Sequence, residues 1–80
     1  MKRKDQMLII LELLNDIDRA NTIGGEDSIE YYGQVQNRTS AILDQYPKND
    51  PFYKVVSWLF NDVHIKLEEV FEKLSSEATE

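Results

Sequence analysis

Residues 51–74 read PFYKVVSWLFNDVHIKLEEVFEKL, a segment with apolar side chains on two sides of a helix. At about 100° per residue, most of them gather on one broad stripe, which we expect to face the core. Trp58 and Ile65 fall on roughly the opposite side, seven residues apart and among charged and amide side chains. The segment therefore predicts a long helix with a core face and a second, narrower apolar face. The core face comprises Phe52, Val55, Val56, Leu59, Phe60, Val63, Leu67, Val70, Phe71 and Leu74.

A second helical pattern covers about residues 4–21. Three further apolar residues widen its main stripe to nearly half of the helix circumference. This helix is therefore expected either to lie centrally between two neighbours or to share a seam with a second copy of the chain. Gly24 and Gly25 follow it, and glycine accepts the left-handed conformation that ends many helices. The main stripe is Met7, Ile10, Leu11, Leu14 and Ile17, and the widening residues are Ile9, Leu13 and Ala20.

The third pattern predicts a helix over about residues 28–46. Asp27 and Glu30 have the spacing of a capping box, in which the Asp27 carboxylate accepts a hydrogen bond from an amide of the first turn. Gly33 lies inside this helix, where glycine costs about 1 kcal/mol relative to alanine. We expect Gly33 to permit the close approach of another helix, and a functional kink is the alternative.

Short connections join the three predicted helices, with Pro47 ending one and Asp50 capping the next. Such connections favour antiparallel neighbours, so residues 1–80 predict a single all-α domain, an antiparallel (up-down-up) three-helix bundle. Residues 75–80 are expected to form a frayed acidic tail. Because an 80-residue chain without cysteine builds only a small core, dimerisation into a larger bundle is the support that remains.

The formal net charge of −6 indicates which partners suit the chain. Negative charge repels polyphosphate, so we expect no nucleic-acid ligand and a protein partner with a basic surface. No apolar run approaches the roughly 18 to 20 residues of a membrane span. The basic residues 2–4 precede an apolar run, as in a signal peptide, but Glu12 interrupts that run and no small-residue cleavage site follows. We therefore expect a cytoplasmic protein that binds no membrane.

The titratable side chains of residues 51–74 lack the spacing that catalysis needs. Ser57 and His64 are separated by about 10.5 Å of helix rise, beyond the reach of a nucleophile and its base. A single histidine and the absence of cysteine argue against a metal site and other cofactors. The prediction is a protein that is not an enzyme. The alternative is a magnesium-dependent, nucleotide-processing enzyme that uses Glu69 and Glu72 with a second subunit.

The remaining candidates suit contact with protein. Trp58 and Ile65 form an anchor strip, since tryptophan is enriched among interface hot spots. Two nearby carboxylates are expected to steer a basic surface toward that strip. A second possible seam lies on the wide apolar arc of the first helix. The predicted interface comprises Trp58, Ile65, Tyr53, Glu69, Glu72, Ile9 and Leu13.

These features predict a small acidic protein-interaction module that binds, and inhibits or regulates, a larger protein. Size and charge alone make it comparable with immunity proteins and phage-encoded inhibitors, which is an analogy at the level of the fold. We also predict a homodimer, because the anchor strip and the wide apolar arc of the first helix both leave apolar surface that a second copy could bury. The other alternative is a structural scaffold component. Three covers for Trp58 and Ile65 stay open: a second copy, a target, or the chain's own helices.

Overall fold

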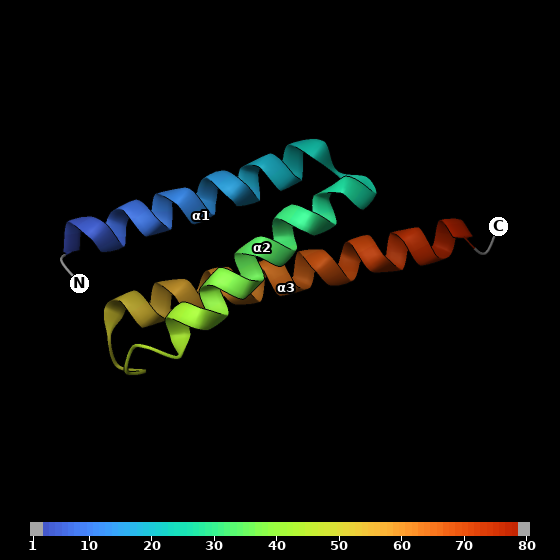
Figure 1. Ribbon diagram of the computed structural model, residues 1–80. Coiled ribbons are helices and arrows are strands. Elements are labelled where there is room, and N and C mark those ends of the chain that lie inside the picture. Colours follow the sequence, from blue (N-terminus) through green and yellow to red (C-terminus); the bar gives the residue numbers. More distant parts are fainter. Residues whose placement is uncertain (1–2, 79–80) are drawn as a thin grey trace.

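The computed structural model describes residues 3–78 and contains three helices (Figure 1). Helix α1 spans Arg3–Ile23, α2 spans Gly25–Leu43 and α3 spans Pro51–Ala78. Helix α2 runs antiparallel to the other two, so α1 and α3 point in the same direction. This arrangement confirms the predicted all-α, up-down-up three-helix bundle.

Helix α2 lies between the two outer helices and packs on both, whereas α1 and α3 touch each other at few points (Figure 1). The bundle is therefore open along the side where α1 faces α3. Asn21 joins the three helices near the end of α1: its Oδ1 atom accepts hydrogen bonds from the Tyr32 hydroxyl of α2 and, at 3.3 Å, from the Lys66 Nζ of α3. The outcome is an elongated molecule with principal extents of 50 × 21 × 14 Å.

The core lies where α2 meets its two neighbours, and it uses only part of each predicted apolar stripe. In α3, Val55 and Phe71 were expected in the core but are exposed. In α1 the predicted main stripe is right for Ile17 and Ile10, which lie in the core cluster or pack against it. It is wrong for Met7, Leu11 and Leu14, which are exposed because α2 covers the side of the widening residues. The core cluster consists of Leu13, Ile17, Ala20, Tyr32, Val35, Leu59, Val63 and Leu67.

Of the two predicted helix caps, one is confirmed and one is wrong. The backbone N–H of Phe52 donates to the Asp50 carboxylate at 2.8 Å, which confirms Asp50 as the cap of α3. The predicted capping box at Asp27 is wrong, because α2 already begins at Gly25. Gly24 has a φ of 66°, a conformation that reverses the chain within one residue and suits glycine. Asp27 instead lies in the first turn, where its charge complements the helix dipole.

The other boundaries also differ from the prediction. Helix α2 ends at Leu43 instead of residue 46, and the N–H of Gln45 donates to the Ile42 carbonyl in a tight turn ahead of Pro47. Helix α3 continues to Ala78, so the frayed tail was wrong as far as that residue, and residues 79–80 lie outside the described chain. Residues 75–78 contain neither glycine nor proline, and nothing in them stops a helix.

Gly33 was expected to let another helix approach closely, and this expectation is also wrong. A β-carbon built at Gly33 would meet no atom within 4 Å among the described residues. Its backbone also lacks the positive φ that would require glycine. Gly33 therefore weakens α2 without a compensating contact.

Candidate protein-binding groove

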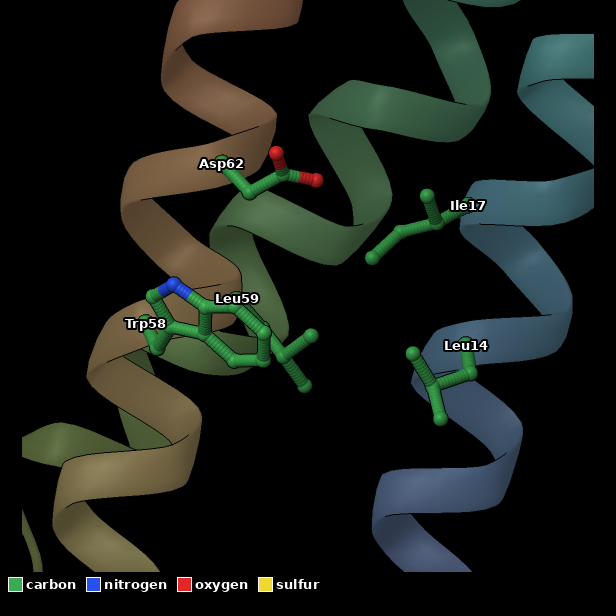
Figure 2. A pocket seen from close by; sticks show the side chains of 5 residues that line it. All are labelled: Leu14, Ile17, Trp58, Leu59 and Asp62. Atoms are coloured by element: carbon green, nitrogen blue, oxygen red, sulfur yellow. The ribbon is translucent and has the colours of Figure 1, made fainter.

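An apolar hollow lies between the middles of α1 and α3. It is lined by Leu14, Ile17, Trp58, Leu59 and Asp62 and holds about 170 Å³. In Figure 2, Leu14 and Ile17 point from α1 toward the side chains of Trp58 and Leu59 on α3, and Asp62 projects into the same space. The walls are thus mostly hydrocarbon, with one carboxylate at the edge.

A second hollow of about 170 Å³ continues along the same side toward the starts of α1 and α3. Because both hollows lie between the same two helices, we refer to them together as the α1–α3 groove. The second hollow is lined by Gln6, Met7, Ile10, Pro51, Phe52 and Val55.

The walls of the α1–α3 groove carry large apolar side chains in solvent. Trp58 is 73% exposed, Met7 59% and Leu14 45%. Ile65, about two helical turns beyond Trp58 on α3, is 54% exposed. The chain's own helices therefore do not cover Trp58 or Ile65. Exposed apolar side chains that cluster in this way mark interaction surfaces more often than isolated ones do.

The structure brings only some of the predicted interface residues to the groove. Glu69 and Glu72 are exposed on α3 beyond Ile65. Tyr53 is half-buried and lies about 140° around α3 from Trp58, so it does not share the strip.

The second predicted seam, at Ile9 and Leu13, is not a free surface. Leu13 is fully buried and Ile9 packs against the core cluster, because α2 covers this side of α1. The alternative seam is therefore wrong as an exposed surface. Sequence reasoning instead assigned three residues to the core that the structure leaves exposed beside the groove: Met7, Leu11 and Leu14. The only signal for them was the unusual width of the apolar arc of α1.

Polar contacts fix α2 against its neighbours on either side of the core. Arg38 of α2 donates to Glu12 of α1 at 2.9 Å and lies 3.7 Å from Asp16. On the other side, Gln36 Nε2 of α2 lies 3.4 Å from His64 Nδ1 of α3, and His64 Nε2 lies 3.1 Å from Glu68 one helical turn along α3. These pairs are largely exposed, and such pairs contribute about 0 to 1 kcal/mol each.

The Tyr32 hydroxyl is the titratable group that burial perturbs. Desolvation raises the pKa of Tyr32 above its ordinary value of 10.0, and the negative charges of Asp62 and Glu69 raise it further. At neutral pH the phenol is therefore protonated and donates to Asn21. This hydrogen bond joins α2 to the end of α1.

The structure contains no cluster suited to metal chemistry among residues 3–78. No group of three or more His, Asp or Glu side chains in that range is placed to hold a metal ion. Ser57 lies two helical turns from His64 on the same helix, and Glu68 is the acidic partner of that histidine. Within one copy of the chain, Ser57 and His64 are therefore too far apart to act as a nucleophile and its base.

No family model, curated protein or solved structure matches this chain. Within the described residues, none of the helices combines the length and apolarity that a bilayer crossing requires.

Proposed function

We propose that this chain is a protein-interaction module that acts by packing the α1–α3 groove against another polypeptide. One observation carries the proposal: two helices that barely touch present exposed apolar side chains to the same groove. Trp58 is the central anchor, because tryptophan combines a large apolar surface with few rotatable bonds. The proposal includes no chemistry by the chain itself.

Burial of these side chains supplies the driving force for binding. Moving a leucine or methionine side chain from water to an apolar contact is worth about 1.5 to 3 kcal/mol. Met7, Leu14 and Trp58 lie on both walls, so one polypeptide covering the groove would bury all three. Association consumes part of this energy through lost freedom of motion. The groove therefore suits a partner that fills its full length.

The wider form of the proposal concerns what the module acts on. We propose that it also binds and regulates a larger cytoplasmic protein with a basic surface, through exposed carboxylates outside the α1–α3 groove. The support is the net charge of −6, with exposed carboxylates such as Glu69 and Glu72 beside the apolar strip. Complementary charge would accelerate encounter and orient the partner, while apolar contact would hold it.

Site-specific photo-crosslinking tests the surface. p-Benzoylphenylalanine is placed at position 14 or 58, on the two walls of the groove, in otherwise unchanged full-length protein. The control carries the same group at Leu8, which is also exposed but lies about 120° around α1 from Leu14. Each protein is irradiated first in purified form and then in a cell extract.

The proposal expects crosslinks to polypeptide from positions 14 and 58 in at least one of the two conditions, and few from position 8. Circular dichroism must show the same helix content for the three proteins. Equal crosslinking from position 8, or none from the groove positions, would contradict an interaction surface in the α1–α3 groove.

A further inference from the structure

We infer that the polypeptide filling the α1–α3 groove is a second copy of this chain, packed antiparallel to the first. The inference rests on the proposed function, since it names the occupant of the same surface. It is carried by the spacing and the charge pattern of the exposed residues along both walls.

Each wall carries a coiled-coil-like seam that the chain's own core does not use. Along α1 the exposed residues follow steps of three and four residues, and the same alternation runs along α3. This spacing is that of helices that pack side by side over several turns. All ten residues are exposed. The α1 seam is Lys4, Met7, Leu11, Leu14 and Asp18, and the α3 seam is Pro51, Val55, Trp58, Asp62 and Ile65.

The charges of the α1 seam are arranged for antiparallel self-pairing. Lys4 and Asp18 each lie seven residues from Leu11, on opposite sides of it. A two-fold axis across the groove near Leu11 therefore places Lys4 of one copy beside Asp18 of the other, twice. In a two-fold interface each such contact occurs in both directions. A parallel pairing would instead set Lys4 against Lys4 and Asp18 against Asp18.

Helix α3 carries a similar pattern around Trp58, which lies opposite Leu14, about one helical turn along the groove from Leu11. Lys54 and Asp62 each lie four residues from Trp58, again on opposite sides. Asp62 projects into the groove in Figure 2, where an antiparallel copy brings a lysine within reach. Lys66 of the same chain lies 4.0 Å from Asp62, and a lysine of the second copy would add an opposite charge on the side of Asp62 that faces the groove.

The resulting dimer has a defined architecture. The α1 helices of the two copies lie antiparallel to each other, as do the two α3 helices, and the four form a central four-helix bundle. Helix α2 of each copy stays on the outside, where it already covers the other side of the core. Leu11 lies near the axis, with Trp58 about one helical turn from it. The two hollows of each copy receive apolar seam residues of the other copy.

A uniformly basic partner fits the groove less well. The end of the groove near the starts of α1 and α3 carries Lys4 and Lys54, while the other end carries Asp18 and Asp62. A basic helix would meet like charge at the first end. A second copy reversed end for end meets opposite charge at both.

The test is a charge exchange read out by sedimentation equilibrium. The dimer dissociation constant is measured for the unchanged chain, for Lys4→Asp, for Asp18→Lys and for the double variant. We expect a dimer that each single variant weakens about tenfold, or roughly 1.4 kcal/mol. The double variant should return to within about threefold of the unchanged chain. Lys48→Asp, an equal change of charge in the α2–α3 connection, is the control and should leave the constant unchanged.

Three results would overturn the inference. A monomer at all concentrations would remove the second copy; crosslinks from position 58 to another protein would then leave the proposed function standing. A dimer in which the double variant stays as weak as the single ones would remove the antiparallel arrangement. Absence of both a dimer and any groove crosslink would remove the proposed function as well. Trp58→Ala, an exposed substitution that spares the core, checks that association uses this face, and a dimer of unchanged affinity would also count against the inference.

Discussion

The two sides of α3 have similar sequences and opposite surroundings. The side that faces α2 holds Val56 and Val63, both fully buried, whereas the side toward α1 holds Val55 and Trp58, both exposed. All four lie at helical spacing within one segment. The difference comes from the neighbouring helix: α2 packs closely on α3, and α1 does not. Burial of an apolar helix face is favourable, and within one copy of the chain only the α3 face toward α2 is buried.

The first test compares adjacent leucines of α1, one on the closed side and one on the open side. Leu13 is fully buried against α2, while Leu14 lines the groove. Leu13→Ala should lower the free energy of unfolding by about 2 to 5 kcal/mol, because it leaves a cavity in the core. Leu14→Ala should lower it by less, and mainly by weakening association. Urea denaturation followed by circular dichroism measures both.

Protein concentration separates the two effects. Loss of a core contact destabilises the folded chain at any concentration, whereas loss of a dimer contact matters only where the dimer is populated. The deficit of Leu14→Ala should therefore shrink on dilution and that of Leu13→Ala should persist. Equal and concentration-independent losses would show that α1 buries both leucines and that the open side is closed in solution.

Periodicity in the sequence predicts where helices lie better than it predicts which of their faces are buried. It predicted the long helix from Pro51, and it predicted the Asp50 cap because that cap depends on neighbours in the chain. The exposure of Trp58 was also readable, since polar residues surround it on its helix. The core side of α1 was not readable, because its apolar arc is wider than one neighbour covers. Only the tertiary choice of α2 over α3 decides that Leu13 is inside and Leu14 outside.

The turn between α1 and α2 shows a second limit. A capping box at Asp27 is a sound local pattern, but Gly24 and Gly25 allow α2 to begin earlier, directly after the reversal. The helical end of α3 shows the converse. A polar composition predicted fraying, yet composition alone does not stop a helix that contains no breaking residue.

The second test concerns Tyr32, whose hydroxyl joins α2 to the end of α1. Tyr32→Phe removes the hydrogen bond to Asn21 and should lower the free energy of unfolding by roughly 1 to 1.5 kcal/mol. The raised pKa adds a pH dependence: the phenol ionises at lower pH in the unfolded chain than in the folded one. This contribution is complete below about pH 10 and is lost as the pH rises through the folded pKa.

Unfolding free energies between pH 8 and pH 11 measure that dependence. The unchanged chain should lose stability more steeply than Tyr32→Phe above pH 10. Tyr53→Phe is the matched control. Tyr53 lies in the first turn of α3, at the opposite end of the bundle from Glu69 and from the Asn21 side chain that accepts from Tyr32. Parallel curves for the unchanged chain and Tyr32→Phe would show that burial of this phenol does not resist its ionisation.

The third test removes the cap at the start of α3, which supports the buried and the exposed side of that helix alike. Asp50→Ala removes the acceptor of the Phe52 amide and should lower the free energy of unfolding by about 1 kcal/mol. Because the cap supports the whole helix, the loss should not depend on protein concentration. Asn49→Ala, one residue earlier, is the control and should have a smaller effect. A concentration-dependent loss for Asp50→Ala would place the cap within the association surface instead.

The smallest expected effect has the opposite sign and probes the closed side. Gly33 lies inside α2, the helix that covers its neighbours, yet a β-carbon there would meet no atom within 4 Å in the described chain. Gly33→Ala should therefore stabilise the fold by about 0.5 to 1 kcal/mol, through helix propensity and a less flexible unfolded chain. A rise in thermal midpoint at unchanged dimer affinity is the expected measurement. If alanine instead destabilises the fold, another group packs against Gly33 in solution. The packed surface of α2 would then extend to Gly33 itself.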